Sequence, residues 1–150
     1  MLSRKKFIRQ AALSAGAIMA GPSMLEAAAY LSPLKLTILH TNDTHSRLEP
    51  FPMDGGRNQG LGGVAGRARL INQIRQEEEH VLLLDAGDIF QGTPYFNIYK
   101  GEPEIRAMST LGYDACTIGN HDFDAGMENL ATQLTRHANF PMLVCNYDFT

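Results

Sequence analysis

The sequence predicts an α/β fold with a mainly parallel sheet, and two observations support this. Short apolar runs that suit buried strands alternate along the chain with longer stretches of helical periodicity. Polar residues follow the end of each apolar run, and in open parallel sheets ligands collect at the carboxyl ends of the strands. We therefore expect one α/β unit with a ligand site at that edge of its sheet.

The expected elements follow one another in a strand-helix-strand order. The strands are read from apolar runs, which cover residues 34–39, 81–84, 115–118 and 141–145. The helices between them are read from their periodicity, at residues 63–79, 102–111 and 125–138. Residues 47–62 are rich in proline and glycine, and we expect them to form one long loop.

The composition limits the size and the partners of this unit. A chain of 150 residues, 44% of them apolar, can bury one core. Four basic residues and one acidic residue precede Tyr30, which leaves 9 basic and 15 acidic residues and a net charge of −6 for the remainder. A body of that sign repels nucleic-acid polymers and other polyanions. Chemistry on phosphate would therefore need bound cations.

Residues 1–29 have the composition of an export signal. A basic start is followed by an apolar stretch at 11–21 and by small residues at 27–29 that suit cleavage. The start resembles the bacterial twin-arginine signal, although Lys5 replaces its second arginine. The stretch is too short to span a bilayer, so we expect membrane contact only during export to the bacterial periplasm or cell envelope. The alternative is an amphipathic helix docked on the domain.

The two cysteines are Cys116 and Cys145, and neither lies in a CxxC pair or at zinc-finger spacing from a histidine. Both lie in apolar runs, so we expect buried thiols. A disulfide formed after export is the alternative.

Four residues at the strand ends are candidate metal ligands. Asp43 and His45 are two residues apart, so in an extended segment they project to the same side. Asp88 offers two oxygens that can bridge two ions, and Asn120 offers a neutral amide oxygen. Such ligands favour zinc, manganese, iron or cobalt over calcium. Each signal is weak alone, since similar residues also cap loops, but their combination at one sheet edge indicates a functional site.

Three longer motifs carry a family resemblance. They are LHTNDTHS at 39–46, GDIFQGT at 87–93 and YDACTIGNHDFD at 113–124. Together they resemble the calcineurin-like metallophosphoesterases, and the longer matches are to the 5′-nucleotidases. Asp122 stands where glutamate is more usual in that family. The resemblance implies a layered α-β-β-α domain, of which residues 30–150 supply the first, mainly parallel βαβ half.

The resemblance also implies roles for individual residues. Asp43 and His45 would hold one metal, Asp88 would bridge, and Asn120 would bind the second. His121 would be the general acid, held by Asp124. Two divalent ions, among Zn, Mn, Co and Fe, would clamp the phosphoryl group and activate water. The implied substrate is a nucleoside 5′-monophosphate or another small phosphate ester.

Other assignments stay open. Asn146 either contacts phosphate or supports a ligand, and the alternative is that it caps a strand end. His40 either ends a strand or supports a ligand. His80 and His137 are expected at the surface. The family takes further histidines and a substrate domain from later residues, so we expect residues 30–150 alone to be inactive. The alternatives are a non-catalytic fragment or metal-binding module, or a relative acting on phosphodiesters, nucleotide sugars or sulfur-linked groups.

If residues 1–29 are an export signal, the mature protein isolated from its native host should begin at or near Tyr30. Intact-mass measurement and N-terminal sequencing check this. Retention of Met1 on the folded protein would contradict the assignment.

Overall fold

The structure is a computed structural model that describes residues 34–147. The expected export signal at 1–29 therefore lies outside the described residues. Residues Lys35–Thr150 form one compact unit. Among the described residues no helix has the length and apolar character needed to cross a membrane.

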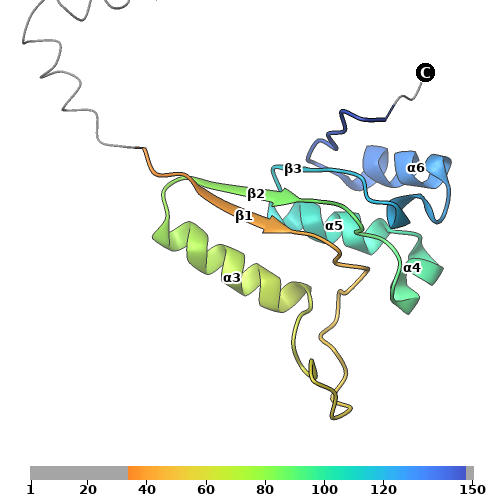
Figure 1. Cartoon of the computed structure of the whole chain (residues 1–150), viewed down its shortest axis with the longest axis horizontal. Coiled ribbons are helices and arrows are strands. Elements are labelled where there is room, and N and C mark those ends of the chain that lie inside the picture. Colours follow the sequence, from red (N-terminus) through yellow and green to blue (C-terminus); the bar gives the residue numbers. More distant parts are fainter. Residues whose placement is uncertain (1–33, 148–150) are drawn as a thin grey trace, which may run out of the picture. The chain divides into compact units, whose positions relative to one another are not determined.

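A three-stranded parallel sheet forms the centre of this unit (Figure 1). Its strands are β1 (Thr37–Thr41), β2 (Val81–Asp85) and β3 (Ala115–Cys116), in the order β1-β2-β3. β1 and β2 pair along their whole length, from Thr37 opposite Val81 to Thr41 opposite Asp85. Both strands therefore end at the same edge, which confirms the expected parallel α/β arrangement.

Helices connect and flank the strands. They are α3 (Val64–Glu77), α4 (Pro94–Tyr99), α5 (Glu102–Leu111), the short 3-10 helix η1 (His121–Phe123) and α6 (Met127–His137). The bounds of α5 agree with the prediction, and α3 and α6 each end within two residues of theirs. α4 was not predicted, because six residues are too few to show a helical period.

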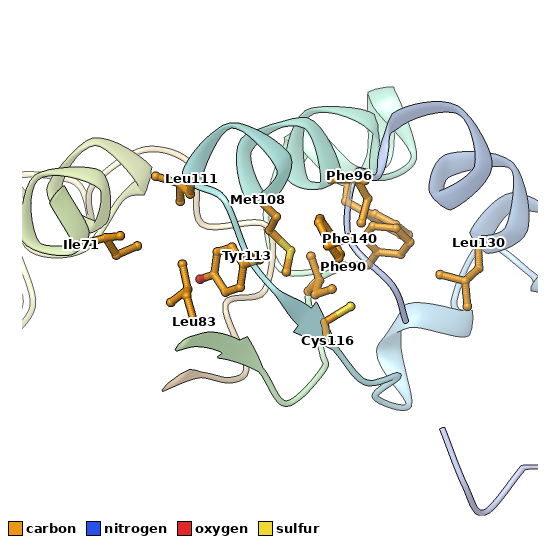
Figure 2. Close-up of a cluster of buried hydrophobic side chains, with 12 residues drawn as sticks. Ile71, Leu83, Phe90, Phe96, Met108, Leu111, Tyr113, Cys116, Leu130 and Phe140 are labelled. Atoms are coloured by element: carbon orange, nitrogen blue, oxygen red, sulfur yellow. The ribbon is translucent and has the colours of Figure 1, made fainter. Parts of the chain in front are cut away.

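One hydrophobic core holds these elements together (Figure 2). It lies where α5 faces β2, and Leu83 and Ile105 at this contact are at most 1% exposed. Fully burying a side chain of this size contributes roughly 1.5–3 kcal/mol. The other elements each add members, among them Ile71 from α3, Phe96 from α4, Cys116 from β3 and Leu130 from α6.

The expected fourth strand at 141–145 is reduced to an isolated bridge. Met142 lies parallel to Cys116, whose N–H donates to the Pro141 carbonyl at 3.1 Å and whose carbonyl accepts from the Leu143 N–H at 2.8 Å. The position was right and the length wrong. β3 is only two residues long, so it offers little backbone to pair, and Pro141 has no N–H to donate.

Two further expectations were partly wrong. β1 lies about two residues later than the apolar run 34–39, because Leu34 and Leu36 are exposed and the pairing with β2 begins at Thr37. Cys116 is buried as expected, whereas Cys145 is exposed because the segment after the bridge leaves the sheet. Both thiols are free.

Candidate metal centre

The loops after β1 and β2 remain paired beyond the end of the sheet. The Asp43 N–H donates to the Gly87 carbonyl at 3.0 Å, and the His45 N–H donates to the Asp88 carbonyl at 3.0 Å. The Ser46 N–H then donates to the Ile89 carbonyl at 2.8 Å. The two loops therefore run side by side, which brings residues from both to one place.

The backbone at this edge is left-handed rather than extended. Asp43, His45, Ser46 and Asp88 have φ angles of 51°, 45°, 56° and 57°. The expectation that Asp43 and His45 share a side through strand alternation was therefore wrong, because turns bring them together instead. A non-glycine residue in this conformation costs about 1–3 kcal/mol and persists only where its surroundings hold it.

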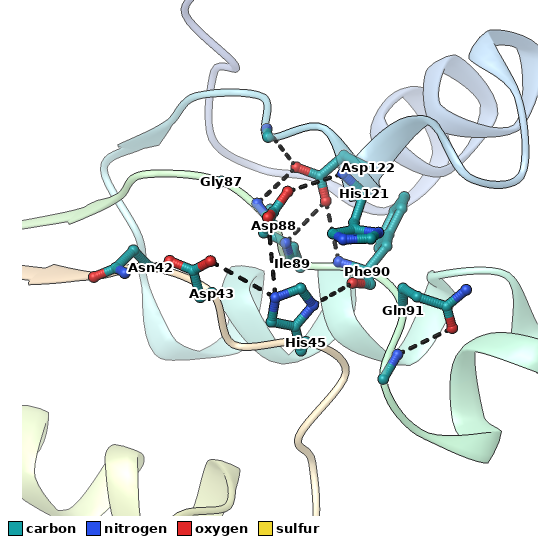
Figure 3. A network of polar contacts seen from close by, with 12 residues as sticks. Asn42, Asp43, His45, Gly87, Asp88, Ile89, Phe90, Gln91, His121 and Asp122 are labelled. Carbon is teal, nitrogen blue, oxygen red and sulfur yellow. Dashed lines mark hydrogen bonds and ion pairs between the residues drawn. The ribbon is translucent and has the colours of Figure 1, made fainter.

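Asp43, His45 and Asp88 converge to form a candidate metal site (Figure 3). One ligand atom from each lies within 4.8 Å of the other two. His45 Nε2 is 3.7 Å from Asp43 Oδ1 and 3.9 Å from Asp88 Oδ2. Two donors that each lie about 2.1 Å from one ion are at most about 4.2 Å apart. Both separations from His45 Nε2 lie within this limit, so His45 can share a transition metal with either carboxylate.

The orientation of His45 favours metal binding through Nε2. Its Nδ1 lies 3.3 Å from the Phe90 carbonyl oxygen, which can only accept a hydrogen bond. The proton of neutral His45 therefore belongs on Nδ1, and the Nε2 lone pair faces the two carboxylates. Histidine ligands in metalloproteins are usually oriented by such a second hydrogen bond.

The loop after β3 joins the site through Asp88. The His121 N–H donates to Asp88 Oδ1 at 2.9 Å, so one carboxylate oxygen faces His45 and the other binds the third loop. Asn120 precedes His121 at the start of η1, where it is exposed. Asn120 thus lies on the loop that contacts Asp88, and its role as a ligand of the second ion remains a prediction.

His121 and Asp124 form a hydrogen-bonded pair beside the candidate metal ligands. His121 Nδ1 lies 2.9 Å from Asp124 Oδ2, and the His121 ring centroid is 5.3 Å from that of His45. The Asp124 hydrogen bond raises the pKa of His121, and the same bond lowers the pKa of Asp124. Gln91 adds a second donor to Asp124 Oδ2 at 3.3 Å.

Asp122 connects the loops, a role that the sequence analysis missed. Its side chain is fully buried and accepts four backbone N–H groups. Burial raises the pKa of Asp122, while these hydrogen bonds act in the opposite direction. The only sequence signal was the acidic residue usual at this position in the family. The donors are Asp88 at 3.1 Å, Ile89 at 2.9 Å, Phe90 at 3.0 Å and Gly119 at 2.8 Å.

Asp85 has a similar role where β1 and β2 end. It is 5% exposed, accepts from Thr41 Oγ1 at 2.5 Å and accepts from the Gly87 N–H at 2.9 Å. Tyr113 Oη lies 2.7 Å from the same Thr41 hydroxyl. Asp85 is thus engaged in holding the strand ends.

The other histidines lie away from this cluster. His40 lies within β1 with an exposed side chain, and His80 precedes β2 with a side chain 42% exposed. His137 ends α6, where its carbonyl accepts from Ser109 Oγ at 2.7 Å. Asn146 is exposed in the segment after the bridge.

A hollow of about 610 Å³ opens beside the candidate ligands. Asp43 and His45 form one wall, and α3 and the 47–62 loop form the others. The guanidinium of Arg47 lies 4.3 Å from the centroid of the Phe51 ring in that loop. The hollow has the size of small-molecule sites, and it combines apolar walls with cationic side chains. The cationic side chains that line it are Arg47 and Arg67.

Comparison with known proteins agrees with the geometry of this edge. The model of the calcineurin-like phosphoesterase family matches residues 36–149. The chain belongs to this family. Within it the chain is similar to 5′-nucleotidases, which confirms the resemblance seen in the motifs. The Bos taurus 5′-nucleotidase is 51% identical over 118 residues, which cover 76% of this chain and 21% of that protein.

Two solved structures share the fold. A 5′-nucleotidase precursor from Thermus thermophilus has a TM-score of 0.68 and 43% identity, and the match covers 75% of this chain and 22% of that one. The Haemophilus influenzae NAD nucleotidase has a TM-score of 0.67 and 35% identity over 75% of this chain and 21% of its own. The chain therefore spans about a fifth of the length of these relatives.

Replacing Asp122 should destabilise the domain by more than its size suggests. Asp122→Asn keeps the shape but turns an NH₂ group towards amide donors, so we expect a loss of about 3 kcal/mol or more of unfolding free energy. Urea denaturation of metal-free protein measures this. Asp114→Asn is the control, because exposed Asp114 accepts one hydrogen bond among residues 34–147, from the Leu83 N–H, and its replacement should cost about 1 kcal/mol. Equal losses for both variants would contradict the role given to Asp122.

Proposed function

We propose that the chain supplies part of the active site of an exported two-metal phosphoesterase. The reaction is hydrolysis of nucleoside 5′-monophosphates or related small phosphate esters. The observation that carries the proposal is the convergence of Asp43, His45 and Asp88 beside the His121–Asp124 pair. Metal ligands and a polarised imidazole at one sheet edge are the two components that metal-assisted hydrolysis requires.

In this proposal Asp43 and His45 hold one ion, Asp88 is shared, and Asn120 contributes to the second. The donor set of carboxylates, imidazole and amide suits zinc, manganese, cobalt or iron. When bound, two such ions neutralise charge on the phosphoryl oxygens and lower the pKa of an attacking water. The hydrogen bond from His45 Nδ1 to the Phe90 carbonyl keeps the Nε2 lone pair directed at the ion.

His121 is proposed to donate a proton to the leaving oxygen of the ester. Asp124 accepts a hydrogen bond from His121 Nδ1, so Nε2 of the imidazolium carries the transferable proton. The raised pKa of His121 keeps more of the protonated form at neutral pH than a free imidazole would have. Once the proton has been transferred, the Asp124 hydrogen bond keeps the ring in the same orientation.

The substrate class is supported by charge, by size and by the relatives. A hollow of about 610 Å³ that contains two arginines admits a small anion. The negative charge of the body disfavours nucleic-acid polymers. The matching proteins are named 5′-nucleotidases, and one is named an NAD nucleotidase, so a nucleotide with a phosphate anhydride is the second candidate substrate. Export to the periplasm or cell envelope is proposed from the composition of residues 1–29.

Chelation tests the metal requirement. Phosphate release from AMP by the complete protein should vanish with a chelator and return when Mn²⁺, Co²⁺ or Zn²⁺ is added, because the carboxylates alone repel phosphate. Turnover that resists chelation would disprove the two-metal mechanism. Elemental analysis of the same samples separates the alternative of a non-catalytic module, which would hold at most one ion per chain.

Replacing the proposed acid should slow catalysis without removing metal. In the complete enzyme His121→Ala should lower kcat by about 10²–10⁴, the usual contribution of general acid–base catalysis. Metal content should stay near that of the wild type. An ester with an activated leaving group, which needs no proton, should recover much of the rate.

Asp124→Asn provides the companion test. It removes the charge that stabilises the imidazolium, so activity should fall and the pKa of His121, followed by NMR, should decrease. Loss of metal from His121→Ala without rescue by the activated ester would instead show that His121 is a ligand.

A further inference from the structure

Glu104 is a buried carboxyl group in the core, and Arg47 and Arg67 line the small space next to it. It lies in the first turn of α5, is 3% exposed, and forms no ion pair within residues 34–147. Its Oε1 contacts Ser46 Oγ in the loop after β1. Ser46 follows the candidate ligand His45 directly and is 1% exposed. Glu104 thus connects a core helix to the loop that carries the metal ligands.

The contacts around Glu104 form one continuous hydrogen-bond chain. Ser46 Oγ donates to Glu104 Oε1, Ser46 Oγ lies 2.8 Å from Thr93 Oγ1, and Thr93 Oγ1 donates to the Ser46 carbonyl at 3.0 Å. Glu104 is therefore the acceptor that fixes the Ser46 hydroxyl, and Thr93 fixes the Ser46 backbone.

The environment of Glu104 disfavours the charged form of its carboxyl group. Its second oxygen, Oε2, is buried and has no hydrogen-bond partner among the described residues. The adjoining space is only about 10 Å³, the lower limit for a single water molecule, so solvent gives a charge there little stabilisation. Burial raises the pKa of Glu104 in consequence.

The loop at Ser46 needs such support. His45 and Ser46 are both left-handed, which is a costly conformation for residues with a side chain. The N–H, carbonyl and hydroxyl of Ser46 are all engaged, by Ile89, Thr93 and Glu104. The fixed backbone of Ser46 thereby sets the direction in which the His45 side chain projects from the loop.

We infer that Glu104 is a positioning residue: a buried carboxyl group that accepts the Ser46 hydroxyl and holds Ser46, and through the Ser46 backbone the imidazole of His45, in the geometry for metal binding. The inference rests on the proposed metal site for its function. The hydrogen-bond chain itself is present without a metal, so it can be tested separately.

The test uses the full chain and three variants. Glu104→Gln keeps an acceptor oxygen in a side chain of the same shape, Glu104→Leu removes the acceptor, and Thr93→Val interrupts the chain without opening a cavity. Gln133→Leu is the matched control, because Gln133 is also buried and its Oε1 has no hydrogen-bond partner within residues 34–147. Gln133 lies on α6, where its side-chain NH₂ donates to Asn129. Mn²⁺ affinity, the melting temperature and amide hydrogen exchange at His45 and Ser46 are measured for each.

Glu104→Leu should weaken Mn²⁺ binding by about 10–100-fold, the usual effect of losing a residue that supports a metal ligand. Exchange at His45 and Ser46 should accelerate, because their N–H groups bond across to the loop after β2. Glu104→Gln should bind Mn²⁺ within about threefold of the wild type, and Thr93→Val should fall between the two. Gln133→Leu should change the melting temperature without changing Mn²⁺ affinity.

Two outcomes would overturn the inference. Unchanged Mn²⁺ affinity and exchange in Thr93→Val and Glu104→Leu would show that the chain positions nothing. Binding by Glu104→Gln as weak as by Glu104→Leu would show that the acceptor oxygen for Ser46 is not what positions the loop. If Glu104→Leu does not fold, Thr93→Val and Glu104→Gln decide. Absence of Mn²⁺ binding by the wild type would count against the proposed function, and the exchange rates would then decide the role of Glu104.

Discussion

The arrangement of the candidate site depends on one carboxylate that accepts four backbone N–H groups. Asp122 has no solvent contact, and its donors come from the loop after β2 and from its own loop after β3. These bonds fix the two loops against each other. Asp88 lies on the loop after β2, so one of its oxygens reaches the His121 N–H on the loop after β3 while the other faces His45 on the loop after β1. The candidate metal ligands and the proposed acid thus share one support.

Three buried acids each connect segments that are far apart in the sequence. Asp122 joins the loops after β2 and β3, Asp85 joins the ends of β1 and β2, and Glu104 joins α5 to the loop after β1. Burying such groups disfavours their charged forms, and burial raises the pKa of all three. A hydrophobic core would hold these elements together more cheaply, but it would not orient individual amides and hydroxyls. The buried acids account for how a strained, left-handed loop keeps one conformation.

Local patterns in the sequence were enough to predict much of this fold. α5 was placed correctly from its helical periodicity, which is a local signal, and Pro103 in its first turn and Gly112 after its last residue agree with these bounds. The edge at which Asp43, Asp88 and His121 meet followed from the parallel order of the strands. The role of Asp122 could not be predicted, because three of its four donors lie more than thirty residues away and all are backbone groups without a sequence signature. The left-handed turns at Asp43 and His45 accompany other long-range bonds, to the carbonyls of Gly87 and Asp88, so strand alternation was the wrong guide there.

The glycines before Asp88 and Asn120 give steric room to the neighbouring loop, in addition to the left-handed turn (φ 95°) that Gly87 makes. A β-carbon on Gly119 would lie 2.1 Å from Asp88 Oδ1, and one on Gly87 would lie 2.4 Å from the Gly119 nitrogen. Gly119 has no positive φ, so steric room rather than backbone freedom requires glycine there. Each glycine therefore admits the other loop to the distance at which Asp122 can bind amides from both. Asn120 is fixed relative to Asp88 by this contact, so the position of the proposed second metal ligand follows from how closely the two backbones pack.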